Sequence, residues 1–131
     1  MGVSALAAGR HIKTGHRILV VDDDRRVLNF LRLKLVAEGN EVVTAMNGPD
    51  ALAAIESQKP EILVIDIAMP GISGLDVLRI LRSSSSDLPV IVMSAATDLA
   101  SEALRLEANS FVPKPFDPND LVNTIESILD C

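Results

Sequence analysis

The chain has 131 residues and a formal net charge of −6 at pH 7, with 48% hydrophobic but only 2% aromatic residues, so we expect one acidic domain with an aliphatic core. This composition argues against direct nucleic-acid binding, and no apolar run approaches the roughly 20 residues of a membrane span. The single cysteine, Cys131, excludes an internal disulfide framework and a cysteine metal site, and it favours a reducing, cytoplasmic location.

Residues 1–16 show neither a helical nor a strand period. We expect them to form a flexible N-terminal extension, followed by a single domain over residues 17–131. Both histidines of the chain, His11 and His16, lie in this extension, and we assign a role to neither. The basic residues of the extension follow its short apolar patch, which is the wrong order for a signal peptide.

Five short apolar runs follow at regular intervals along the chain. They are ILVV (18–21), EVVTA (41–45), ILVI (62–65), VIVM (90–93) and FV (111–112). Most are rich in Val and Ile and have no polar face, which is typical of strands in a parallel sheet that is covered on both sides.

A helical pattern follows each of these runs. The first has apolar residues at positions i, i+3 and i+7, namely Leu28, Leu31 and Leu35, and Gly39 is well placed to end it. The other helices are marked by Leu52 and Ile55, by Leu75, Leu78 and Leu81, by Leu99, Ala103 and Leu106, and by Leu121, Val122, Ile125, Ile128 and Leu129. Strand and helix therefore alternate five times, which predicts a (βα)5 α/β sandwich of three layers with right-handed crossovers.

Polar side chains follow four of the five predicted strands. In an open parallel sheet, ligands bind outside the carboxyl ends of the strands. The residues at these ends are Asp22, Asp23 and Asp24 after the first strand, Asp66 after the third, Ser94 after the fourth and Lys114 after the fifth. The second strand is followed by nothing ionisable, and we expect it at an edge of the sheet.

This set of side chains predicts a site for a metal ion and a phosphoryl group. Several carboxylates at one edge need a cation, and oxygen ligands without His or Cys suit Mg²⁺. A lysine and a hydroxyl group add binding partners for an anion. Asp66 is the lone acid on a central strand, which makes it the natural nucleophile for an acyl phosphate. Asp24 is better explained as the cap of the first helix.

Four motifs in this order, "ILVVDDD", "VIDIAMPGISG", "VMSAA" and "FVPKPF", resemble the receiver domain of two-component response regulators. The resemblance covers residues 17–130. It implies a flavodoxin-like fold whose five parallel strands have the order 2-1-3-4-5. It also implies the role of a signalling domain that catalyses only its own phosphorylation and dephosphorylation, and is otherwise not an enzyme.

The resemblance also implies roles for the residues around the predicted metal. Asp66 would be the phosphoacceptor and a ligand of Mg²⁺. Asp22, Asp23 and the backbone carbonyl of Ala68 would be further ligands. Lys114 would hold a phosphoryl oxygen, and the Lys114–Pro115 peptide bond is expected to be cis.

Ser94 and Phe111 would form the switch in such a domain. The Ser94 hydroxyl would pair with a phosphoryl oxygen, and Phe111 would turn inward in response. This would change the face formed by the fourth helix, the fifth strand and the fifth helix. The implied partners are a sensor histidine kinase or a phosphotransfer protein as donor, and a downstream protein or an attached output domain as target. Glu107 stands where the family usually has Gly, so we expect a somewhat different turn there.

Two other functions remain open on the residues. A haloacid-dehalogenase-like phosphatase also uses an Asp nucleophile with Mg²⁺, and residues 22–24 loosely satisfy its DxD pattern. The chain lacks the later paired acids and the cap domain of those enzymes. A flavodoxin-like FMN binder is disfavoured because the acids would repel the phosphate and no Trp or Tyr is present to stack on a flavin.

Overall fold

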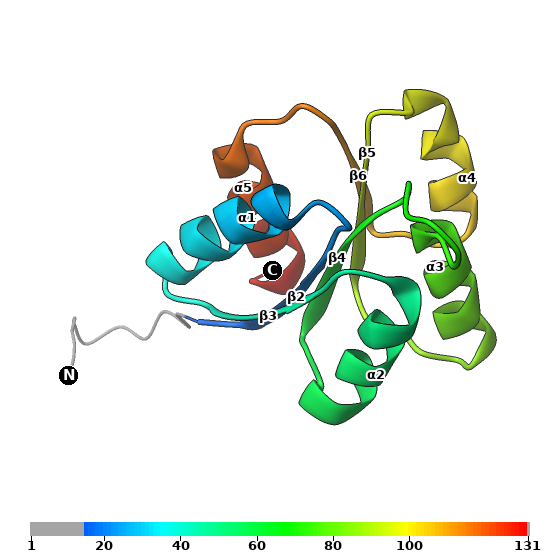
Figure 1. The fold of residues 1–131 in the computed structure, drawn as a ribbon, viewed down its shortest axis with the longest axis horizontal. Coiled ribbons are helices and arrows are strands. Elements are labelled where there is room, and N and C mark those ends of the chain that lie inside the picture. Colours follow the sequence, from blue (N-terminus) through cyan, green and yellow to red (C-terminus); the bar gives the residue numbers. More distant parts are fainter. Residues whose placement is uncertain (1–14, 131) are drawn as a thin grey trace.

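Five parallel strands form one sheet at the centre of the molecule (Figure 1). The computed structural model describes residues 15–130. The strands are β2 (Arg17–Val21), β3 (Glu41–Ala45), β4 (Ile62–Asp66), β5 (Val90–Ser94) and β6 (Ser110–Pro113). Their order across the sheet is β3-β2-β4-β5-β6, which confirms the predicted order 2-1-3-4-5 and the edge position of the second strand.

Helices cover both faces of the sheet. They are α1 (Arg25–Ala37), α2 (Gly48–Gln58), α3 (Gly74–Ser83), α4 (Ala100–Arg105) and α5 (Pro118–Leu129). Buried residues of α1 and α5 pack on one face of the sheet, and those of α2, α3 and α4 pack on the other. Figure 1 shows the same division, so the predicted sandwich of three layers is confirmed.

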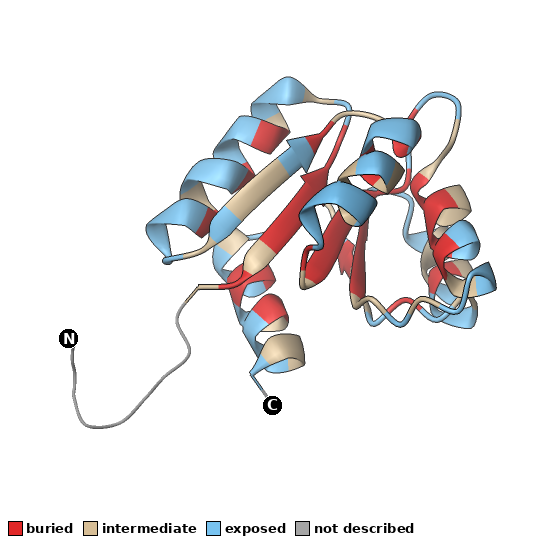
Figure 2. Ribbon diagram, turned by 90° about the horizontal axis from the view of Figure 1, so that it is seen from below, coloured by how far each residue is buried: buried red, intermediate tan, exposed pale blue. Residues whose placement is uncertain are grey.

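The side chains of each central strand alternate between the two cores. In β2, Ile18 and Val20 join the core beneath α1 and α5, whereas Leu19 and Val21 join the opposite core. All five residues of β4 and of β5 are buried. Figure 2 shows this burial of the central strands and the partial exposure of the edge strand β3.

Local capping residues set several helix ends, and those of α1 are as predicted. The Asp24 side chain accepts a hydrogen bond from the Arg26 N–H at 2.9 Å, so it caps α1. Asn47 caps α2 and Asp117 caps α5, in each case directly before the first turn. Gly39 follows the end of α1 with a φ of 95°, a backbone conformation that favours glycine.

The fourth helix is shorter than its apolar pattern predicts. Thr97–Leu99 forms a 3₁₀ turn, and α4 then spans only six residues. Because Glu107 replaces the glycine usual in the family, the turn after α4 was expected to differ. That expectation is wrong, because Glu107 has a φ of 69°, the left-handed conformation that a glycine would favour. The guanidinium of Arg82 donates two hydrogen bonds to the Glu107 carbonyl, at 3.2 and 2.9 Å.

His16 has a structural role that the sequence did not reveal. It lies directly before β2 and is only 6% exposed, with both ring nitrogens against carboxylates. Treating it as incidental was therefore wrong, because long-range packing buries it. His11 and the rest of the predicted extension before Gly15 lie outside the described residues. Within residues 15–130, none of the helices has the length and apolar character needed to span a bilayer.

Candidate functional site

Three carboxylates meet at the carboxyl end of the sheet. Each of Asp22, Asp23 and Asp66 has an oxygen atom within 4.8 Å of an oxygen of the other two. Asp22 follows β2 and Asp66 ends β4, and these neighbouring parallel strands pair Val21 with Ile65. The sequence prediction that these acids share one edge is therefore confirmed.

The three acids differ in their exposure to solvent. Asp22 is 1% exposed and Asp66 is 4% exposed, whereas Asp23 is exposed. Backbone groups hold Asp22 in place, because its Oδ1 accepts from the Asp24 N–H at 2.9 Å and its own N–H donates to the Ala45 carbonyl at 3.2 Å. A buried carboxylate pair beside an exposed third acid forms a half-open site that a cation can enter from solvent.

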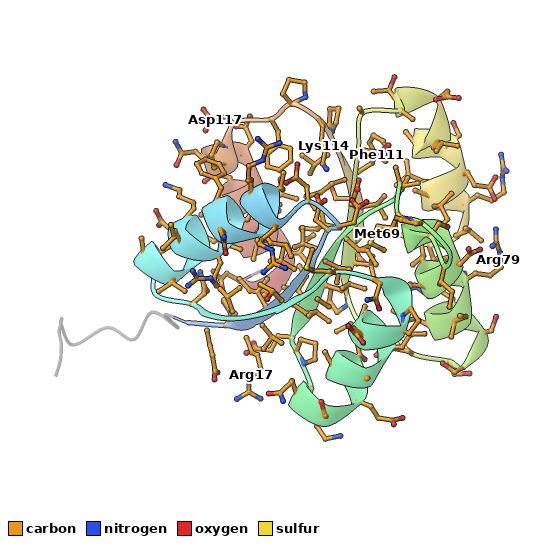
Figure 3. The ribbon with its side chains drawn as sticks, in the orientation of Figure 1. Arg17, Met69, Arg79, Phe111, Lys114 and Asp117 are labelled. Carbon is orange, nitrogen blue, oxygen red and sulfur yellow. The ribbon has the colours of Figure 1, made fainter. Side chains whose placement is uncertain are left out.

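Lys114, directly after the edge strand β6 (Figure 3), contacts two of these acids, Asp22 and Asp66. Its Nζ lies 2.8 Å from Asp22 Oδ2 and 3.4 Å from Asp66 Oδ1. Its backbone N–H donates to the Ser94 carbonyl at 2.9 Å, which continues the pairing of β5 with β6. The Lys114–Pro115 bond is cis, as predicted.

Burial and like charge shape the electrostatics of this cluster. Burial raises the pKa of Asp66, the charge of Asp22 raises it further, and the ammonium of Lys114 offsets part of this. Burial would lower the pKa of Lys114, but its contacts with Asp22 and Asp66 outweigh that effect and raise it. The cluster thus favours any added positive charge.

The other predicted site residues surround this cluster. Ser94 ends β5 beside β4 and is 1% exposed, and its Oγ accepts from the Ala96 N–H at 2.9 Å. Ala68 is exposed in the loop after β4. Phe111 is half-buried in β6, opposite Val92. The structure thus brings the three acids within 4.8 Å of one another, with Lys114 against Asp22 and Asp66, and places Ser94, Ala68 and Phe111 on the neighbouring segments.

Gly74 supports Asp66 and was missed in the sequence. A Cβ atom at this position would lie 2.4 Å from the Asp66 carbonyl oxygen, so α3 can begin so close to the strand end only with glycine. The Gly74 N–H donates to the Ile67 carbonyl at 3.1 Å. The glycines of "AMPGISG" were the available signal, but nothing in the local sequence shows which backbone atom would approach them.

The chemistry of these donors fits Mg²⁺. The cluster offers carboxylate oxygens and no His or Cys, and two of its three acids are buried with one lysine between them. Hard divalent cations take such oxygens, and Mg²⁺ is usually bound through one or two carboxylates while it keeps water ligands. Asp22, Asp23 and Asp66 would hold the ion.

Comparison with known proteins identifies relatives of this chain. A family model described as the response regulator receiver domain matches residues 18–126. The chain is 41% identical over 115 residues to the response regulator MprA of Mycobacterium avium (strain 104), a match that covers 86% of this chain and 50% of MprA. The chain thus spans about half the length of this curated relative.

Solved structures resemble the fold closely. The receiver domain of the Francisella response regulator 1452 superposes with a TM-score of 0.83 at 30% identity, covering 86% of this chain and 95% of that one. The response regulator TrrA of Thermotoga maritima, solved in complex with Mg²⁺-BeF, gives a TM-score of 0.81 at 35% identity and covers 87% of this chain and 99% of TrrA.

Proposed function

The chain belongs to the family of response regulator receiver domains, and we propose that it accepts a phosphoryl group on Asp66 from a histidine kinase or phosphotransfer protein, with Mg²⁺ as its cofactor. Members of this family typically signal and are not enzymes acting on a separate substrate. The observation that carries the proposal is the meeting of Asp66 with two further acids and Lys114 at one edge of the sheet.

The transfer is a displacement at phosphorus. A carboxylate oxygen of Asp66 attacks the phosphoryl group of a phosphohistidine, the new O–P bond forms as the P–N bond breaks, and the imidazole nitrogen leaves with the electron pair. Lys114 already lies 3.4 Å from Asp66 and neutralises negative charge on the transferred oxygens. When bound, Mg²⁺ supplies further positive charge against these same oxygens.

The signal leaves the site through Ser94 and Phe111. Phosphorylation adds about 1.5 to 2 negative charges. In the described conformation the Ser94 hydroxyl accepts from the Ala96 N–H, and it can turn to donate to a new phosphoryl oxygen. The space that it leaves lets the half-buried ring of Phe111 move inward, which changes the face of α4, β6 and α5 that a target protein reads.

The outer face of α1 offers a docking surface for the phosphodonor. Phe30, Leu33 and Val36 lie at spacings of three and are 56%, 61% and 49% exposed. Arg25 and Arg26 precede them at the end of α1 that begins beside the acidic site. This apolar stripe with basic residues suits an amphipathic kinase helix that carries acidic side chains beside its phosphohistidine.

The phosphatase alternative lacks support from the same geometry. That mechanism needs an attacking carboxylate directly after β2. There, Asp22 already accepts from the Asp24 N–H and from Lys114, and Asp24 caps α1.

The test is phosphorylation by a small-molecule donor. Wild type treated with acetyl phosphate and Mg²⁺ should gain one phosphoryl group in its intact mass, and Asp66→Asn should gain none. Asp24→Asn is the matched control, because this neighbouring acid caps a helix outside the site and should leave the mass gain unchanged. A full mass gain in Asp66→Asn, or the same gain without a divalent cation, would contradict the proposal.

A further inference from the structure

A second charged cluster lies at the opposite end of the sheet from the acidic site, near Arg17 (Figure 3). Its centre is His16, whose Nδ1 lies 2.9 Å from Glu61 Oε1 and whose Nε2 lies 2.9 Å from Asp130 Oδ1. The partners come from distant segments, since Glu61 precedes β4 and Asp130 follows the last residue of α5. The imidazole therefore joins the base of the sheet to the end of α5.

The protonation state of His16 decides how many of these bonds can form. A protonated imidazole has two N–H donors, one for each carboxylate. A neutral imidazole has one donor and one lone pair, and a carboxylate can only accept. When His16 loses its proton, one of its two nitrogens therefore faces a carboxylate oxygen without a hydrogen between them.

The other charged groups near the His16 ring either bond to other partners or line the hollow beside it. The Arg17 guanidinium donates to Glu41 and to the Gln58 carbonyl, while its backbone N–H donates to Glu61 at 3.1 Å. The His16 N–H donates to Asn40 Oδ1 at 3.0 Å. The solvent-open hollow beside His16 has as its charged lining residues Arg17, Glu41, Lys59 and Glu61. Within residues 15–130, the groups around His16 do not form a cluster of three ligands close enough to share a metal ion.

Helix α5 is consequently fastened to β2 at both of its ends. Lys114, ahead of α5, bonds Asp22 directly after β2, and Asp130, after α5, bonds His16 directly before β2. The contact between Lys114 and Asp22 belongs to the phosphoryl site. If the proposed function holds, Lys114 turns toward the phosphoryl oxygens and its contact with Asp22 weakens. The contact between His16 and Asp130 then contributes more to holding α5 against β2.

We propose that His16 is a proton-dependent anchor for the C-terminal end of α5. With the proton bound, His16 holds the last turn of the helix against the base of β2 and β4. With the proton lost, only one of the two contacts keeps a hydrogen; Glu61 is also held by the Arg17 N–H, so Asp130 is the partner released and the last turn opens more often. Since α5 is part of the face that a target would read, this anchor makes that face sensitive to pH.

Asp130→Asn tests the anchor with little risk to folding, because the Asp130 side chain is already 39% exposed. Glu126→Gln is the matched control, since it removes a negative charge from the same turn without removing a partner of His16. Thermal unfolding and amide exchange would be measured without Mg²⁺ or phosphodonor at a mildly acidic pH of about 5.5 and a mildly basic pH of about 8.5. The test is thus independent of phosphorylation.

The anchor predicts a difference that depends on pH. At the lower pH, Asp130→Asn should melt about 3 °C below Glu126→Gln, and amides of residues 127–130 should exchange at least about threefold faster. At the higher pH both differences should shrink by about half or more. His16→Gln should show the same loss at low pH. The proposal is overturned if Asp130→Asn matches Glu126→Gln at both values, or if the difference does not change with pH.

Discussion

The ammonium group of Lys114 lies closer to Asp22 than to Asp66, at 2.8 Å from Asp22 Oδ2 and 3.4 Å from Asp66 Oδ1. Asp22 is 1% exposed, so in the absence of a metal this contact supplies the nearest positive charge for a buried carboxylate. A divalent cation at the three acids would compete with Lys114 for the same oxygen.

Removing this lysine should therefore separate metal binding from phosphorylation. Lys114→Met is expected to bind Mg²⁺ about three- to tenfold more tightly, because a competing cation is gone. It should also accept phosphoryl from acetyl phosphate at least about tenfold more slowly, because a positive charge is missing from the transition state. Calorimetric Mg²⁺ titration and intact-mass kinetics would measure the two effects.

Lys59→Met is the control for that experiment. Lys59 lies at the other end of the sheet, at the C-terminal end of α2, so both measurements should stay at their wild-type values. Weaker Mg²⁺ binding in Lys114→Met would show that the lysine organises the acids and does not compete for them.

Asp66→Asn should stabilise the metal-free protein at neutral pH. Burial and the charge of Asp22 raise the pKa of Asp66 in the folded state. The folded state therefore holds this proton more tightly, and stability falls as pH rises from the unfolded pKa, about 3.9, through the folded one. The variant lacks this penalty, so its Tm should exceed that of wild type by about 4 °C at pH 7.

The gain from Asp66→Asn should vanish as pH falls below the ordinary aspartate range, where wild-type Asp66 is protonated in both states. Asp23→Asn serves as comparison, since Asp23 is exposed and should give a smaller gain. Thermal melts from about pH 3 to about pH 8 would follow both variants. An equal or lower Tm for Asp66→Asn at neutral pH would contradict a raised pKa for Asp66 in the folded state.

The capping box at the start of α3 should contribute to stability. The Ser73 side chain accepts from the Asp76 N–H at 3.2 Å, and the Asp76 side chain accepts from the Ser73 N–H at 3.1 Å. Ser73→Ala should lower the free energy of unfolding by about 1 kcal/mol in urea denaturation. Ser83→Ala, at the exposed last position of the same helix, should be close to neutral.

Acid should remove the contribution of Asp76 to the same capping box. The hydrogen bond that the Asp76 carboxylate accepts from the Ser73 N–H holds the pKa of Asp76 below its usual value. The contribution of the carboxylate is therefore present above the unfolded pKa and is lost as pH falls through the folded one. Asp76→Asn should be less stable than wild type at pH 7, and the difference should close under acid. A difference that is constant with pH would exclude this origin.

Glu107→Gly should stabilise the turn between α4 and β6. Glu107 has a φ of 69°, a conformation that costs a residue with a Cβ about 1–2 kcal/mol. Glycine removes that cost but gains freedom in the unfolded chain, so we expect a net increase of about 0.5 kcal/mol in the free energy of unfolding. Glu107→Ala keeps the Cβ and should not show the gain. Equal effects of the two substitutions would attribute the change to the lost charge.

Much of the fold follows from short-range patterns in the sequence. A strand buried on both faces must be apolar along its length, and a helix lying on it must be apolar every three or four residues. These requirements located all five strands, and Asp24 marked a helix start because capping involves only neighbouring residues. The meeting of Asp22 with Asp66 was predictable because parallel strands end at the same edge. The roles assigned to the site residues stay predictions, namely those of Asp22, Asp23, Asp66, Ala68, Ser94, Phe111 and Lys114.

The sequence by itself thus determined the alternation of strand and helix and the edge at which the acids gather. Only the tertiary structure decided which distant groups touch: His16 with Asp130, 114 positions apart, Gly74 with the carbonyl of Asp66, and Arg82 with the turn at Glu107. The physical reason is range. Periodicity and capping depend on residues within a turn or two. These contacts instead depend on how separate elements pack against one sheet, and the local sequence does not show which residues that packing brings together.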